Sequence, residues 1–135
     1  MLTSKVTYLG ELRTEATHIR SGEHFITDAP VDNKGKGSAF SPTDLASTSL
    51  AACAITTMAI GADGRGIKIE KMDAEVVKVM ASGPRRIAEI QMKISMTISP
   101  DTPENRETLQ EIALHCPVAR SLHPDLIQSM TFEYQ

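Results

Sequence analysis

Residues 40–62 read FSPTDLASTSLAACAITTMAIGA, and this stretch decides the architecture of the chain. Ser41 can cap a helix, Pro42 suits its first position, and Asp44 lies three residues after the cap, as in a capping box. The eighteen residues 45–62 carry no charge. A helix without a polar face must be buried nearly all round, and a chain of 135 residues cannot easily cover it. We therefore expect a second copy of the chain to help bury it, in a homodimer.

The length and composition are those of a single globular domain spanning residues 1–135. Apolar residues make up 41% and charged residues 23%, which gives no support to disorder. The net charge is −3 and no run of Lys and Arg exceeds two residues, so nucleic acid is not an expected partner. The N-terminus lacks the apolar stretch of a signal peptide, and five of the eighteen residues 45–62 are Ser or Thr. We expect a cytoplasmic protein that does not enter a membrane.

The remaining patterns predict an α+β domain of order ββ-α-ββ-α-β with an antiparallel sheet. The expected elements are strands at 6–19 and 24–27, a loop at 28–40, a helix at 41–62, a hairpin with arms at 67–80 and 85–98, a helix from 102 to 116, and a closing edge strand at 130–134. The second arm of the hairpin alternates apolar and polar residues, which predicts that one face of the sheet is solvated.

The two cysteines, Cys53 and Cys116, are the residues whose chemical role the sequence leaves undecided. In a chain without a secretion signal they are expected to be reduced, as inert core residues or as redox-active thiols. Cys53 lies in mid-helix, where the helix dipole contributes little, so a thiolate there would need a cation from elsewhere in the fold. Cys116 shares an apolar helical stripe with Leu109 and Ala113, which favours a core position. No CxxC or HxxxH pair and no phosphate-binding glycine loop is present, so neither a metal nor a cofactor is expected.

Two motifs resemble those of a known family. FSPTDL at 40–45 with AAC at 51–53 resembles the segment that opens the central helix of the OsmC/Ohr family, and HCPV at 115–118 with SL at 121–122 resembles its second cysteine motif. The loop that begins with TDAP at 27–30 is similar to a branch of the family distinct from the better-studied hydroperoxidases. The expected order of elements also matches along essentially the whole chain.

This resemblance implies an intertwined homodimer, with long helices packed between antiparallel sheets and two sites at the subunit interface. In the peroxidases of the family, the first cysteine attacks an organic hydroperoxide and becomes a sulfenic acid. The second cysteine condenses with it to a disulfide, and a dithiol such as dihydrolipoamide regenerates both thiols. The resemblance thus gives Cys53 the attacking role and Cys116 the resolving role, with organic or fatty-acid hydroperoxides as substrates.

Two other residues of the family's site have only approximate counterparts here. The arginine that supports the thiolate is best matched by Arg20, although a solvated turn residue is the alternative. The glutamate that directly follows the helix proline is replaced by Thr43. Asp44 is the nearest carboxylate, but it lies one residue later, is one methylene shorter, and is also explained by a capping role. This departure leaves a rival function open: an OsmC-like dimer with little turnover, which binds a ligand or senses oxidants. A structural dimer with two core thiols is a third reading.

Overall fold

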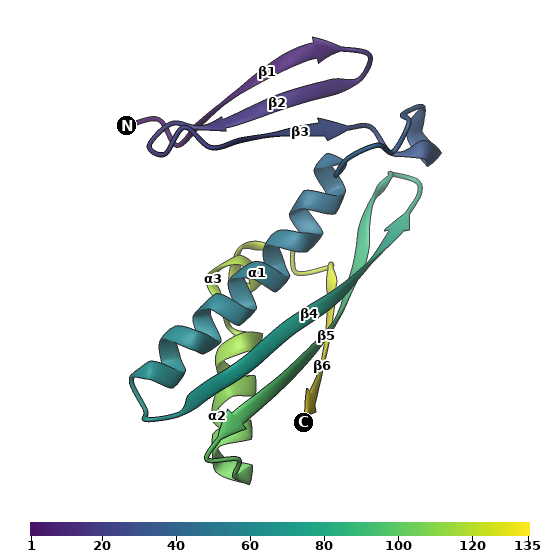
Figure 1. Cartoon of the computed structure of the whole chain (residues 1–135). Helices are drawn as coiled ribbons and strands as arrows, with labels where there is room; N and C mark the ends of the chain where they lie inside the picture. The colour runs from purple at the N-terminus through teal and green to yellow at the C-terminus, as the bar shows by residue number, and fades with distance from the viewer. The chain divides into compact units, whose positions relative to one another are not determined.

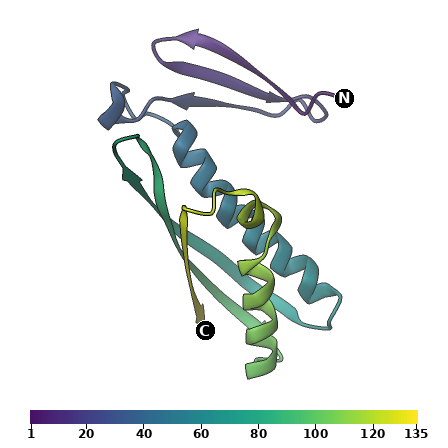
Figure 2. The same ribbon diagram turned by 180° about the vertical axis from the view of Figure 1, so that it is seen from behind.

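The computed structural model describes residues 1–135 as an α+β protein (Figures 1 and 2). Its elements are β1 (Ser4–Gly10), β2 (Arg13–His18), β3 (His24–Asp28), the 3-10 helix η1 (Val31–Asn33), α1 (Pro42–Asp63), β4 (Lys68–Ala81), β5 (Arg86–Ser99), α2 (Pro103–Leu114), α3 (Pro117–Ser121) and β6 (Ile127–Tyr134). They form two compact units, Met1–Ala46 and Ser47–Gln135. The predicted α+β class is confirmed, whereas the single domain over residues 1–135 stays a prediction.

The first unit contains a three-stranded antiparallel sheet in the order β1-β2-β3. The prediction of one strand over residues 6–19 is wrong, because the chain reverses in the middle of that range. Gly10, Glu11 and Leu12 have positive φ angles of 88°, 55° and 65°, and this left-handed turn divides the run into β1 and β2. Glu and Leu rarely adopt this conformation, so only Gly10 marks the turn in the sequence.

The loop between β3 and α1 is closed by its own hydrogen bonds. The N–H of Asp28 donates to the carbonyl of Phe40 at 3.0 Å, which joins the two ends of the loop. Oδ2 of the buried Asp28 accepts hydrogen bonds from the hydroxyl and the N–H of Ser38, at 2.5 Å and 3.1 Å. These two bonds hold the pKa of Asp28 below its ordinary value, with a smaller contribution from the charge of Arg13. The predicted loop is therefore confirmed, and it is built around a buried carboxylate.

The second unit contains a three-stranded sheet in the order β4-β5-β6. β4 and β5 form the predicted antiparallel hairpin, with Met72 opposite Met96. β6 is the expected edge strand, but it runs parallel to β5, with Tyr134 opposite Met96. The prediction of a wholly antiparallel sheet is therefore wrong. The chain leaves β5 and returns through α2 and α3, and a helical crossover of this kind brings the next strand back in the same direction.

The hydrophobic core of the second unit lies between this sheet and the helices that cover one of its faces (Figures 1 and 2). The predicted alternation in β5 is confirmed, because Gln91 and Lys93 are exposed while their apolar neighbours are buried. The fully or nearly fully buried side chains are Leu50, Ala54 and Met58 of α1, Ile90, Met92, Ile94, Met96 and Ile98 of β5, and Leu109 and Ala113 of α2. One face of the sheet is thus packed and the other is polar.

Helix α1 is covered only in part within a single chain. Ala52 and Thr56 are exposed, and Ile60 keeps 68% of its surface exposed. The expected burial on nearly all sides is therefore not reached by one chain alone. By length and composition α1 is also apolar enough to cross a membrane, a test that the core helices of globular proteins pass as well.

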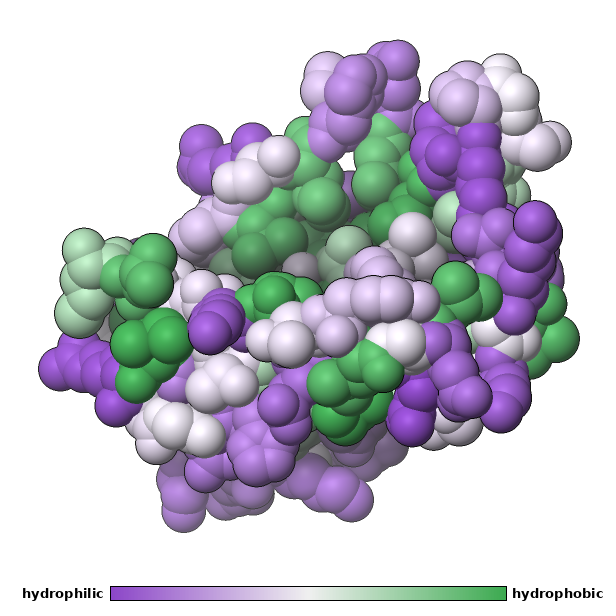
Figure 3. All heavy atoms as spheres, turned by 90° about the horizontal axis from the view of Figure 1, so that it is seen from above, coloured by the Kyte–Doolittle hydropathy of each residue, from purple (hydrophilic) through white to green (hydrophobic).

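Other large apolar side chains also reach the surface, where they are green among the polar residues (Figure 3). In the first unit, Val6 and Tyr8 of β1 are 62% and 66% exposed. In the second unit, Val77 of β4 and Ile127 of β6 are 54% and 59% exposed. Apolar residues that are exposed singly in this way are common on protein surfaces and do not by themselves mark a binding site.

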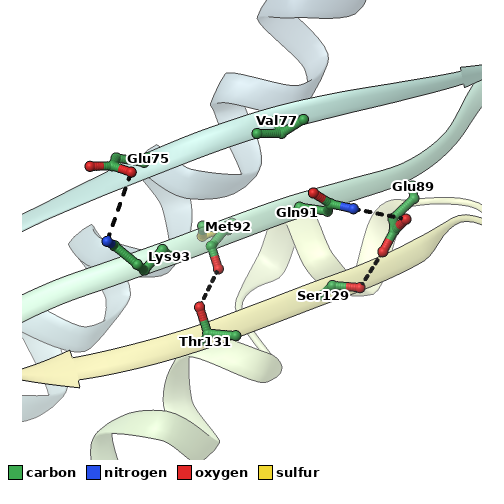
Figure 4. Close-up of a pocket in the computed structure, with 8 residues that line it drawn as sticks. All are labelled: Glu75, Val77, Glu89, Gln91, Met92, Lys93, Ser129 and Thr131. Carbon is green, nitrogen blue, oxygen red and sulfur yellow. Dashed lines mark hydrogen bonds and ion pairs between the residues drawn. The ribbon is translucent and has the colours of Figure 1, made fainter.

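A pocket of about 310 Å³ lies on the polar face of the β4-β5-β6 sheet (Figure 4). Its polar groups pair with one another. Gln91 and Ser129 both donate hydrogen bonds to Glu89, at 3.3 Å and 2.6 Å, and Lys93 forms an ion pair with Glu75 at 4.0 Å. Neither cysteine lines this pocket. Its polar groups therefore satisfy each other, whereas both cysteines belong to the core on the other face of the sheet.

Candidate active site

Cys53 lies in the middle of α1, where its half-buried side chain packs against the core. Thr57 follows one turn later and keeps its Oγ1 3.8 Å from the Cys53 sulfur. This contact is a direct consequence of the helix, in which residues i and i+4 lie on the same face. The predicted mid-helix position is confirmed, so the dipole of α1 itself does little for this thiol.

Cys116 is fully buried, and it lies between two helices rather than within one. α2 ends at Leu114, and Cys116 has extended backbone angles (φ −65°, ψ 158°) as the N-cap of α3. Its burial agrees with the predicted apolar stripe, but its expected place on the second helix is wrong. Pro117 is the cause, because a proline disfavours the helical conformation in the preceding residue and suits the first position of a new helix.

The start of α3 brings a backbone donor to Cys53. The N–H of Val118, in the first turn of α3, donates to the Cys53 sulfur at 3.5 Å. This N–H is available because the first N–H groups of a helix have no carbonyl acceptor within it. The Cys116 thiol lies close enough to Cys53 to contribute to lowering its pKa. From the sequence, a thiolate at Cys53 is expected to need a cation, whereas the groups that the second unit supplies are neutral donors.

The pKa values of the two thiols move in opposite directions. Burial raises the pKa of Cys53, but hydrogen bonds from the Val118 N–H, the Thr57 hydroxyl and the Cys116 thiol outweigh it, and the net pKa is lowered. Burial is also the main reason why the pKa of Cys116 is raised; a hydrogen bond from the Ala119 N–H opposes this, and the neighbouring Cys53 adds to it. The first proton to leave the pair therefore comes from Cys53, while Cys116 stays protonated.

This arrangement suits a nucleophilic thiolate with a second thiol beside it. The thiolate is the reactive form of a cysteine, and Cys53 is the thiol that ionises first and is only half-buried. Cys116 is buried against it, so the partner that Cys116 can reach is an intermediate formed on Cys53. No three His, Cys, Asp or Glu side chains gather in a way that could hold a metal ion.

Asp44 takes part in a capping box with Ser41 at the start of α1. The N–H of Ser41 donates to Oδ2 of Asp44, and the N–H of Asp44 donates to Oγ of Ser41, both at 3.0 Å. The hydroxyl of Thr43 lies 3.2 Å from the same Ser41 hydroxyl. The capping role of Asp44 is confirmed, and its catalytic role stays a prediction.

Arg20 lies in the exposed turn between β2 and β3, and its support of the thiolate likewise stays a prediction. A second arginine of the first unit, Arg13, was not singled out by sequence analysis. Arg13 begins β2 directly opposite the buried Asp28, and neither Arg13 Nε nor Asp28 Oδ1 has a hydrogen-bond partner. Because buried polar atoms without partners are rare, this facing pair is an unusual feature of the first unit.

Comparison with known proteins shows which family the chain resembles. A family model described as OsmC-like protein matches residues 35–128. A search of curated proteins found no match. Among solved structures, a Psychrobacter arcticus 273-4 protein is 49% identical, with a TM-score of 0.89 and coverage of 98% of this chain and 96% of that chain. That protein is provisionally described as an osmotic stress induced and detoxification response protein.

More distant structures share the fold. An OsmC-like protein from Mycoplasma pneumoniae is 17% identical, with a TM-score of 0.81 and coverage of 97% of this chain and 94% of that chain. An organic hydroperoxide resistance protein from Elizabethkingia anophelis is 16% identical, with a TM-score of 0.75 and coverage of 100% and 98%. The family model covers most of the sequence and both cysteine motifs, and the closely similar structure covers nearly all of it. The chain therefore belongs to the OsmC-like protein family.

Proposed function

We propose that this OsmC-like protein is a thiol-dependent peroxidase that reduces organic hydroperoxides, including those of fatty acids. One observation carries the proposal: the Val118 N–H and the Thr57 hydroxyl lie against the sulfur of Cys53, whose pKa is lowered, while the pKa of the buried Cys116 beside it is raised. Such a pair separates a nucleophile from a resolving thiol. The substrate class is supported by the name of a fold relative, the organic hydroperoxide resistance protein of E. anophelis.

In the proposed reaction, the Cys53 thiolate attacks the terminal oxygen of a hydroperoxide, ROOH. An S–O bond forms, the O–O bond breaks, and the alkoxide takes up a proton and leaves as the alcohol, ROH. Cys53 is then a sulfenic acid. The Cys116 sulfur attacks the Cys53 sulfur, its proton leaves with the hydroxyl as water, and a disulfide remains. A dithiol such as dihydrolipoamide reduces this disulfide by two exchange steps and is itself oxidised to a disulfide.

The proposal includes a homodimer in the cytoplasm. α1 leaves Ala52, Thr56 and Ile60 exposed in a single chain, and a second copy would cover this face. Both cysteines are free thiols, as proteins of a reducing compartment have.

The rival function is favoured by the residues at the start of α1. Thr43 occupies the position at which the resemblance expects a glutamate, and the neighbouring carboxylate of Asp44 is bonded to Ser41. A site without a carboxylate that orients an arginine would reduce peroxide slowly. Such a protein would instead bind a ligand or register an oxidant through its thiol pair.

Treatment of the reduced protein with cumene hydroperoxide separates the two functions. A peroxidase is expected to lose both thiols quickly, to form an intramolecular disulfide, and to consume many equivalents of peroxide when dihydrolipoamide is supplied. The loss of thiols is measured by titration, the disulfide by peptide mass spectrometry, and the turnover by peroxide consumption, with Cys53→Ser as the inactive control. A disulfide that forms without turnover would support the rival function. Two thiols that survive excess peroxide would exclude both the peroxidase and the oxidant sensor, and would leave ligand binding or a structural role.

A further inference from the structure

The hydroxyl group of Thr57 has two possible acceptors on Cys53. It donates a hydrogen bond to the Cys53 carbonyl at 2.7 Å, and its oxygen lies 3.8 Å from the Cys53 sulfur. A hydroxyl has a single hydrogen, so it cannot donate to both atoms at once. While it donates to the carbonyl, its oxygen remains available to accept a hydrogen bond from the protonated Cys53 thiol.

The bond to the carbonyl is dispensable. Thr57 follows Cys53 by four residues within α1, so the Cys53 carbonyl also accepts the regular helical hydrogen bond from the Thr57 N–H. The hydroxyl is therefore a second donor to an oxygen that already has one, a contact that Thr side chains often make one turn back along a helix. If the hydroxyl turns away, no buried carbonyl is left without a partner.

We propose that the Thr57 hydroxyl is a two-position donor, which turns from the Cys53 carbonyl to the Cys53 sulfur when the thiol ionises. The protonated thiol has a hydrogen to give and needs an acceptor, whereas the thiolate has none and needs a donor. Rotation about the C–O bond of Thr57 meets both needs without moving a heavy atom. The thiolate then accepts a hydrogen bond from Thr57 in addition to the one from the Val118 N–H.

This role singles out one cysteine of the pair. The groups of the second unit that act on Cys53 are Val118, Thr57 and the Cys116 thiol. Those that act on Cys116 are Ala119, Val118 and Cys53, and Thr57 is not among them. Thr57 therefore directs the negative charge to the first cysteine. The inference deepens the proposed peroxidase function, but the ionisation on which it rests can be measured without any peroxide.

The test measures how fast iodoacetamide alkylates Cys53 as the pH is raised, in full-length protein that carries Cys116→Ser so that one thiol remains. Thr57→Val deletes the hydroxyl and keeps the branched shape of the side chain. We expect alkylation to be roughly tenfold slower at about pH 7, since a hydrogen bond to a charged group is lost. The rates should converge at about pH 10, where the thiol is largely ionised in both proteins.

Three variants make the result specific. Thr57→Ser keeps the hydroxyl and should restore the parent rate, while Thr7→Val alters an exposed threonine of β1 and should change nothing. Thr57→Ala replaces Thr57→Val if the valine protein does not fold, as judged by circular dichroism. The proposal is overturned if deletion of the hydroxyl leaves the pH profile unchanged, if it slows alkylation equally at every pH, or if Thr57→Ser behaves like Thr57→Val. A parent protein that never turns over peroxide, yet shows the expected profiles, would refute the peroxidase function alone.

Discussion

The backbone N–H of Val118 donates a hydrogen bond to the sulfur of Cys53 at 3.5 Å, although the two residues are 65 positions apart in the chain. The bond depends on Pro117, which begins α3 and so leaves the first N–H groups of that helix without an acceptor. The same proline places Cys116 at the N-cap, beside Cys53. One residue thus positions both the second thiol and a donor to the first.

The two thiols should differ in reactivity. Limiting iodoacetamide at about pH 7 should label Cys53 well before Cys116, because the pKa of Cys53 is lowered and that of Cys116 is raised. As the pH rises, the labelling of Cys53 should reach half its maximum below the pH expected for an ordinary thiol, and that of Cys116 above it. Peptide mass spectrometry after quenching measures both rates. The assignment would be contradicted if Cys53 and Cys116 were labelled at equal rates in the folded protein, as they should be after denaturation.

Removal of the second thiol should trap the intermediate on the first. In Cys116→Ser, cumene hydroperoxide should produce a sulfenic acid at Cys53 that persists and is captured by dimedone, because no thiol is present to condense with it. The unmodified protein should give a disulfide and little dimedone adduct. Cys53→Ser serves as the control and should give no adduct. An adduct located on Cys116 in that control would reverse the two roles.

Thr43 and Asp44 should respond differently to substitution. Thr43→Glu restores a carboxylate at the position where the family resemblance expects one, and should accelerate sulfenic acid formation at Cys53. Asp44→Ala breaks the capping box with Ser41 and should lower the free energy of unfolding by roughly 1 kcal/mol. Stopped-flow peroxide consumption and urea denaturation measure the two effects. If Asp44→Ala abolishes peroxidase activity in folded protein, then Asp44 performs the role of the family's glutamate from a position one residue later in the helix.

The exposed face of α1 should form the dimer interface. Ile60→Glu places a charge on the face of the helix that a partner would cover, and should convert the dimer to a monomer or a poorly folded chain. Val77→Glu is a matched control, because Val77 is also exposed but lies on the polar face of the β4-β5-β6 sheet. Light scattering at micromolar concentration measures the mass. A fully folded monomer before any substitution would refute the dimer.

Local patterns were sufficient to predict several elements. The uncharged run after Ser41 predicts α1 closely, and the alternation in β5 predicts which of its faces is buried. Both are properties of residues that lie near each other in the chain. The direction of β6 is different, because its pairing with β5 depends on the path of the whole crossover through α2 and α3. The turn at Glu11 and Leu12 was missed because these residue types rarely take positive φ angles.

The candidate site could likewise be predicted only in part from the sequence. Cys53 and Cys116 could be singled out from the sequence, and their roles follow from resemblance. Their chemical environment could not be predicted, because the donor to Cys53 is a main-chain N–H, and every residue except proline carries one. Only the fold shows which of these groups faces the sulfur. The contact with Thr57 was within reach, since a spacing of four residues in a helix predicts it.

The contact between Cys53 and Cys116 joins α1 to the crossover that leads into β6. A disulfide between them would close a covalent ring that contains β4, β5 and α2, which is most of the second unit. Such a ring restricts the unfolded chain and, on a chain-entropy estimate, stabilises the folded state by about 4 kcal/mol. The oxidised protein would then resist heat and proteases better than the reduced protein. Its lifetime in the cell would therefore be longer after exposure to peroxide.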